Sequence, residues 1–309
     1  MNRILMIWLL AASVILAGPL PLKAEVTGDA EFSHDSNAAD LYAAAAGYRH
    51  PIGGSRSGSW IGFKAGLLIL SDPLGRERFN TLELGYRSRP FEGAGLDLKT
   101  KKLWGDWSPW LYSGNLHYRP DDRWYLEVFG ERSIVDTVTS VRLEYLIDTY
   151  GLSADYKINQ EFTLVGALFT QDITDGNNRF GKVGRVIYVP RGQDHMNFQL
   201  KMRMIDSDFN GTGYFSPEKL TEYYFLFQAA RPFADDNWVF KALLGPGIQM
   251  IDGHNGTDDT KPAFLAEGRI KGWFTQEFGM EGRLGYTTAQ STGGGERYIY
   301  GEMNLVHTW

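Results

Sequence analysis

The chain has 309 residues, no cysteine, and 37 acidic against 31 basic residues, which gives a formal net charge of −6. The lack of cysteine excludes disulfides and thiolate metal sites, and the acidic balance argues against nucleic acid as a partner. Aromatic residues make up 14% of the chain, yet its mean hydropathy is slightly negative at −0.29. A barrel with a polar inner wall and an apolar outer wall averages out in this way.

The first 24 residues have the features of a secretory signal peptide. Arg3 supplies the positive start, 4–17 form an uncharged apolar run, and 22–24 offer a cleavage site. A membrane anchor is the alternative, but the run is shorter than the roughly 20 residues that span a bilayer. We expect 1–24 to be removed and 25–309 to form a single domain, a β-barrel in the bacterial outer membrane.

Apolar and polar residues alternate along segment after segment of the remaining chain. This period of two predicts strands and not helices. In chain order, the clearest segments lie at 124–129, 141–148, 196–204, 222–228, 264–274, 278–284 and 297–308. In the last segment, Ile299 and Met303 fall on one side while Tyr300 and Glu302 fall on the other, and the chain ends on the aromatic residue Trp309.

The spacing of these segments gives 15 or 16 candidate strands after Glu25. Because closed barrels favour even numbers, we predict an all-β, transmembrane, antiparallel up-and-down barrel of about 16 strands, with 14 as the alternative. The register near 89–108 and the join near 150–151 are not fixed by the pattern. Turn-rich stretches between the segments fit short periplasmic turns and longer surface loops.

A soluble β-sandwich would also show alternation, but the placement of the aromatic residues favours a membrane barrel. Interfacial girdles require aromatic side chains near strand ends. The aromatic residues predicted there are Trp104, Trp107, Trp110, Tyr112, Trp238, Trp273 and Trp309.

The polar positions of the strands are expected to face a water-filled lumen. These positions carry both signs of charge. They include Glu83, Arg87, Glu127, Glu131, Arg142, Glu144, Asp148, Arg203, Glu267, Arg269, Lys271, Glu281 and Arg283. Such residues can pair across neighbouring strands and hold the wall in shape, or line a channel and set its selectivity. We expect both roles.

The sequence gives little support for catalysis. It contains six His residues, of which His117 is expected to face the lumen, but no G-x-S-x-G motif and no His-Glu-x-x-His spacing. We therefore predict no enzymatic activity, no cofactor and no metal site.

Three short stretches together resemble a known group of proteins. They are the Ser-Ile-Val-Asp-Thr loop after a strand within 130–137, Asp-Gly-Asn-Asn-Arg at 175–179, and Gly-Tyr-Phe-Ser-Pro within 213–220. Their order and separation resemble the C-terminal barrels of exopolysaccharide export proteins, namely the cellulose synthase outer-membrane subunit and the poly-N-acetylglucosamine export porin. The small stand-alone barrels of the YaiO type are similar in size. The resemblance implies a channel for a secreted polysaccharide, whereas the alternation alone leaves a general diffusion porin or a plugged structural or assembly barrel open.

The motifs add loop residues to the candidate path. Pro217 cannot donate to a β ladder, so it marks a strand entry or a loop folded against the wall. Tyr214 and Phe215 can pack that loop in place or stack on sugar rings, and Asp175 can bond sugar hydroxyls or close a turn. The candidate substrate-path residues are Glu131, Arg132, Asp136, Arg142, Glu144, Asp175, Asn178, Arg179, Arg203, Tyr214, Phe215, Glu267, Arg269, Glu281 and Arg283.

The resemblance also implies partners. The full-length exporters carry an N-terminal array of periplasmic helical repeats, whereas here the predicted barrel follows the signal peptide almost directly. A scaffold of that kind would then be a separate protein, working with an inner-membrane synthase. Other expected partners are outer-membrane lipid, lipopolysaccharide, and the barrel-assembly machinery through the strand ending in Trp309. We expect a monomer.

Overall fold

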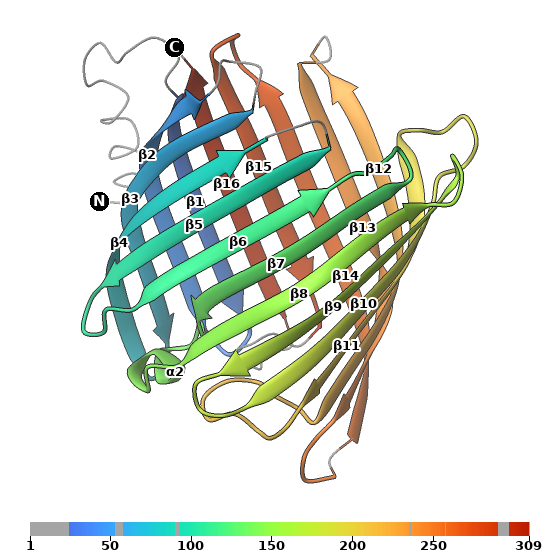
Figure 1. Ribbon diagram of the computed structural model, residues 1–309. Coiled ribbons are helices and arrows are strands. Elements are labelled where there is room, and N and C mark those ends of the chain that lie inside the picture. The colour runs from blue at the N-terminus through green and yellow to red at the C-terminus, as the bar shows by residue number, and fades with distance from the viewer. Residues whose placement is uncertain are drawn as a thin grey trace.

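In the computed structural model, the chain forms one closed antiparallel barrel, which confirms the predicted fold class and strand number. The structure describes residues 25–52, 58–89, 93–234, 237–256, 258–289 and 297–308. Within them, sixteen strands each pair with their sequence neighbours, and β1 closes the barrel against β16 (Figure 1). No helix in the described ranges is long and apolar enough to cross a membrane.

The strands are tilted and cover the whole wall. In chain order they are β1 (Glu25–Asp35), β2 (Asp40–Ile52), β3 (Ser59–Asp72), β4 (Gly75–Ser88), β5 (Ala94–Trp104), β6 (Trp110–Tyr118), β7 (Trp124–Ile134), β8 (Leu146–Lys157), β9 (Phe162–Ile173), β10 (Asn178–Tyr188), β11 (Met196–Ser207), β12 (Lys219–Phe233), β13 (Trp238–Asp252), β14 (Asp258–Trp273), β15 (Phe278–Thr287) and β16 (Tyr298–Thr308). Of the segments that the pattern left open, the one near 89–108 contains β5, and the join at 150–151 lies in the interior of β8.

The two faces of the wall follow from strict alternation along each strand. Large apolar side chains on the outer face stay exposed, such as Leu200 (59%), Ile61 (53%) and Phe225 (51%). Contiguous exposed apolar surface on this scale is not stable in water and is what a lipid-facing wall requires. The polar residues between them point into the lumen.

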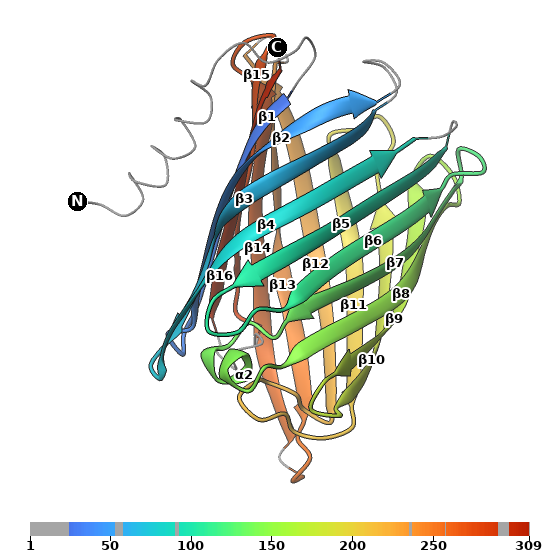
Figure 2. The ribbon, with the colours of Figure 1, turned by 60° about the vertical axis from the view of Figure 1, so that its left-hand side comes forward.

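The two ends of the barrel differ. We call one the terminal end, because β1 begins and β16 ends there, and its connections are all short. The other is the loop end, where the longest connections, 135–145, 208–218 and 288–297, are found. Figure 2 shows the tilted strands between these ends and the short helix α2 (Val138–Arg142) at the loop end. Because short turns are periplasmic and long loops extracellular in such barrels, the loop end corresponds to the cell surface.

An aromatic girdle surrounds the terminal end. Ring centroids lie 4.5 Å apart for Trp124 and Tyr156, and 4.6 Å apart for Trp238 and Phe274. Most of the tryptophans predicted at strand ends fit such girdles, but Trp107 packs against buried residues of the inner wall instead. Trp309 lies outside the described residues.

The prediction of a strand across 141–148 is wrong. Residues 138–142 form α2, with Thr137 as its N-cap, and β8 begins only at Leu146. The Thr137 side chain accepts a hydrogen bond from the backbone N–H of Ser140, which satisfies one of the free donors at a helix start. The apolar residues in this stretch therefore belong to a short helix and to the connection that leads into β8. Val138 and Val141, three residues apart, lie on the same face of the helix.

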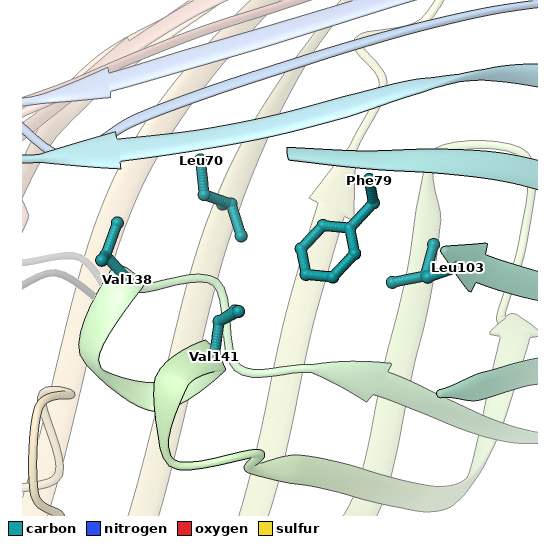
Figure 3. Close-up of a cluster of buried hydrophobic side chains, with 5 residues drawn as sticks. All are labelled: Leu70, Phe79, Leu103, Val138 and Val141. Atoms are coloured by element: carbon teal, nitrogen blue, oxygen red, sulfur yellow. The ribbon is translucent and has the colours of Figure 1, made fainter. Parts of the chain in front are cut away.

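That face of α2 packs against the inner wall. Val138 and Val141 meet Leu70 of β3, Phe79 of β4 and Leu103 of β5, all nearly fully buried (Figure 3). These three wall positions point inward, where polar residues would otherwise face water. Burial of five apolar side chains contributes roughly 1.5–3 kcal/mol each to holding the helix inside the loop end of the barrel.

The outer wall provides a direct test of the membrane assignment. Leu200→Arg, near the middle of β11, is expected to destabilise the barrel in lipid vesicles by about 2–4 kcal/mol, because an Arg is placed in hydrocarbon. The measurement is urea-induced unfolding monitored by tryptophan fluorescence. Asn304→Arg, at an exposed inward position of β16, serves as the control and should change the unfolding free energy little. Equal effects of the two substitutions would contradict the assignment of the two faces.

Candidate functional site

Ion pairs between neighbouring strands line the lumen. The carboxylate of Glu267, nearly buried on β14, accepts from Arg269 Nε (2.7 Å), Arg283 Nε (2.8 Å) and the hydroxyl of Tyr300 (2.6 Å). Three donors from three positions of the wall satisfy this carboxylate, so the group braces β14, β15 and β16. The inward orientation predicted for these charged residues is confirmed, and their first role is to hold the wall.

A second group of this kind lies on the adjacent strands β11 to β13. Arg203 Nε on β11 donates to Glu222 on β12 (2.6 Å), and Gln249 Nε2 on β13 donates to the same carboxylate (2.8 Å). Further from the loop end, Glu281 pairs with Lys271 at 3.3 Å. Acidic and basic groups are thus mixed along the inner wall, so the net charge of the chain does not describe the lumen.

Four residues expected in the lumen lie elsewhere. Arg132 and Asp148 form an ion pair on the outer face, with Arg132 Nε 2.7 Å from Asp148 Oδ1. Asp148 lies on the same face of β8 as the exposed Tyr150 and Leu152, so it points outward, and its chain neighbours point inward. Arg142, in α2, donates to Glu77 (2.8 Å), and Glu144 sits in the following turn with a φ of 59°. The strand expected across 141–148 accounts for the errors at Arg142, Glu144 and Asp148. Arg132 lies on β7, on the same outward face as Val128.

The three sequence stretches quoted above meet in one place at the loop end. Loop 208–218 reaches α2 through Thr137, whose hydroxyl lies 2.7 Å from the carbonyl oxygen of Gly213. Gly213 has a φ of +82°, and a Cβ there would lie 2.4 Å from the Thr139 side chain, so glycine is required at this approach. The loop is therefore fixed to the helix and wall, not free in solvent.

Asn177 is the centre of this contact. Its side chain is fully buried, and Nδ2 lies within hydrogen-bond distance of the Phe209 carbonyl (2.9 Å), the Ser216 hydroxyl (2.9 Å) and the Tyr214 hydroxyl (3.1 Å). The sequence drew attention to Asn178, whose side chain is exposed and donates to Asp208 (3.0 Å). The two amides are adjacent in the chain. Asn177 is turned toward the loop and Asn178 toward solvent, so only Asn177 holds the loop.

Tyr214 is a packing residue of the loop. It is buried, its hydroxyl donates to Asp175 (2.7 Å), and its ring meets Tyr145 edge-on with centroids 6.3 Å apart. Burial raises the pKa of Tyr214, and the hydrogen bond to Asp175 acts in the same direction. The phenol therefore stays protonated and remains a donor at physiological pH.

Arg179 joins the loop to the lumen. Its Nη2 donates to the Phe215 carbonyl (2.8 Å), its Nε to the Ser216 hydroxyl (3.2 Å), and its guanidinium lies 5.0 Å from the centre of the Tyr214 ring. The planar fork of arginine thus contacts two adjacent residues of loop 208–218. Asn177 and Ser216 lie within two of the motifs quoted from the sequence, but they were not among the candidate path residues, because a motif alone does not show which of its side chains are buried.

Two cavities fill the lumen on either side of this contact. One of about 330 Å³ is lined by Arg203, Phe215 and residues of β1 and β12, and one of about 640 Å³ is lined by Glu131 and residues of β5 to β9. Leu41, Asp136 and Arg179 line both, so they mark the constriction. Burial raises the pKa of Asp136, and the carboxylate of Asp35 adds to the rise. The constriction thus lies between the Arg179 guanidinium and the Asp136 carboxyl group.

Comparison with solved structures supports the fold. A structure described as a bacterial polysaccharide outer membrane secretin matches with a TM-score of 0.69, at 12% identity, over 94% of this chain and 100% of that chain. OccAB3 of Acinetobacter baumannii matches with a TM-score of 0.48, at 9% identity, over 93% and 98%. A variant of OccD1 (OprD) matches with a TM-score of 0.49, at 10% identity, over 93% and 95%. No family model and no curated protein matches the sequence.

At these identities the comparisons establish a shared fold and no more. The exposed apolar outer wall is what a barrel in a lipid bilayer requires.

The loop contact can be tested with two adjacent amides. Asn177→Ala removes a buried side chain with three hydrogen-bond partners and is expected to weaken the attachment of loop 208–218 by about 1–3 kcal/mol. Hydrogen exchange of the folded barrel measures this as faster exchange within the loop. Asn178→Ala removes one exposed contact and should leave exchange unchanged. Equal exchange in both variants would show that Asn177 does not hold the loop.

Proposed function

We propose that the protein is an outer-membrane channel through which a secreted polysaccharide crosses the membrane. The observation that carries the proposal is the lumen itself: two cavities that adjoin at a constriction and whose lining includes hydroxyl, amide and charged groups of both signs. An extended polymer of sugars needs such a surface, because it offers many weak hydrogen bonds and no single strong site.

The similarity in fold supports this proposal over a general porin. The polysaccharide secretin is covered along its whole length and has the higher TM-score of the structures compared. The meeting of three stretches that resemble exopolysaccharide export barrels at one constriction supports it further. A diffusion porin would not need these three stretches to meet at one constriction.

The mechanism is passive. The polymer is driven from the periplasmic side, enters at the terminal end, and leaves past α2 and loop 208–218. Polar groups of the wall exchange hydrogen bonds with sugar hydroxyls, and none is strong enough to stop the chain. Arg179 and Phe215 contact the polymer at the constriction, while Tyr214, Asp175 and Asn177 keep the loop in position. No catalytic role is assigned to the lumen.

The partners follow from this mechanism. The secreted polysaccharide is the cargo, and an inner-membrane synthase, coupled through a separate periplasmic scaffold, supplies it at the terminal end. One chain closes a whole barrel around its lumen, so a monomer is sufficient for the proposed transport. Lipid and lipopolysaccharide surround the outer wall, and the barrel-assembly machinery inserts the protein through its last strand.

Single-channel conductance in planar bilayers tests the function. We expect a stable open channel that short oligosaccharides of glucose or of glucosamine block in a concentration-dependent manner, because the sugar displaces water and ions from the constriction. A conducting channel that neither oligosaccharide affects would instead support a general porin. Absence of conductance from a folded barrel would support a plugged or structural role and would contradict the proposal.

A further inference from the structure

Two phenylalanines on the inner wall depart from the rule that the lumen is polar. Phe129 on β7 and Phe169 on β9 point inward, since their neighbours Val128 (59% exposed) and Leu168 (44% exposed) point to the outside. Both phenylalanines are partly exposed to the lumen. Packing against the wall can hold such a ring in place, but it does not use the part of the ring that stays exposed to the lumen.

Both rings lie flat against the wall over a glycine of the next strand. A Cβ built on Gly181 would lie 1.9 Å from Phe169 Cζ and 2.3 Å from each of Cε1 and Cε2, so it meets the face of the ring and not an edge. A Cβ on Gly151 would lie 2.3 Å from Phe129 Cζ. With one face on the glycine, each ring turns its other face to the lumen.

The two rings lie on a single line across the wall. Phe129 pairs with Gly151, Gly151 with Phe169, and Phe169 with Gly181 in successive ladders. The phenylalanines are two strands apart, so their backbones are separated by roughly 10 Å. That separation is comparable to the length of a disaccharide in an extended chain.

A polar line runs beside the rings on the side of the loop end. It passes through Glu131, Thr149, Gln171 and Arg179, which pair in register across β7 to β10 and line the larger cavity. Gln171 Nε2 lies 3.3 Å from the Thr149 hydroxyl. Flat aromatic faces beside amide, hydroxyl and carboxylate groups match a pyranose, which has apolar C–H faces and hydroxyls at its edge.

Three other inward rings that lie over a glycine have a cation beside them. Arg49 lies 4.5 Å from the centre of the Trp60 ring, Arg283 lies 4.9 Å from that of Tyr300, and Lys201 lies 5.9 Å from that of Tyr224. In the described part of the chain, no cation and no second ring is recorded over Phe129 or Phe169. This difference singles out the pair.

We propose that Phe129 and Phe169 form a stacking site for a glycan on the inner wall, with the Glu131–Arg179 line bonding the hydroxyls at its edge. The ligand is an extended, uncharged glycan whose pyranose rings lie in a flat ribbon, as equatorial linkages produce. The two rings receive sugars one disaccharide apart and guide the chain along the wall toward the constriction at Arg179. The site rests on the proposed function and names the kind of glycan that the lumen accommodates.

The test is the block of single-channel current by a linear β-1,4-linked glucose hexamer. The variant Phe129→Leu/Phe169→Leu keeps apolar volume but removes both ring faces. We expect the blocking constant to weaken on the order of ten-fold, with little change in open-channel conductance. Gly181→Ala keeps both phenylalanines but displaces the Phe169 ring, and is expected to weaken the block as well. Phe180→Ala, on the outer face of β10, is the matched control, and the hexamer should block this variant as strongly as it blocks the wild type.

The outcomes separate this proposal from the function. If the wild-type channel is blocked and the Leu variant is blocked equally well, the stacking site is wrong while a glycan channel remains. If the wild-type channel conducts but no glycan blocks it, the proposed function itself fails. An α-1,4-linked glucose hexamer, which coils instead of lying flat, should block more weakly than the β-linked hexamer. Equal block by the two would contradict a flat stacking platform.

Discussion

The structure depends on one constraint: in hydrocarbon, every backbone N–H and C=O must find a partner within the protein. A sheet meets this constraint only when it has no edge, so β1 must pair with β16 as every other strand pairs with its neighbour. Closure fixes the alternation, because each residue faces either lipid or lumen. It also makes the lumen a shared surface to which all sixteen strands contribute. Polar side chains on that surface avoid the desolvation penalty that they would have in hydrocarbon.

Closure alone would leave a wide pore, and the loop end narrows it. Val138 and Val141 anchor α2 on inward apolar positions of β3 to β5, while Asn177 and Arg179 fix loop 208–218 by hydrogen bonds. Apolar packing holds one side of the constriction and polar contacts hold the other. The polar side is the more sensitive of the two, because a buried amide such as Asn177 cannot lose its partners without a cost in free energy.

Much of this was readable from the sequence. The period of two gave the fold class, the number of strands and the orientation of residues such as Glu267 and Arg283, because alternation is set by the local pleat. The segment at 141–148 was misread, since one helical turn and a short alternating run look alike over so few residues. Contacts made by loops were also out of reach: Asn177 and Asn178 are indistinguishable until the turn geometry orients them. The flat rings of Phe129 and Phe169 required the register, which places each opposite a glycine.

The central claim is that an extended glycan passes through this lumen. The most direct measurement is the escape of a fluorescently labelled linear glycan from lipid vesicles that contain the purified barrel. We predict that escape requires the folded barrel and that a branched, globular glycan of the same mass is retained, because only a linear chain threads the constriction between Asp136 and Arg179. Retention of the linear glycan in vesicles whose barrels demonstrably conduct ions would contradict the claim.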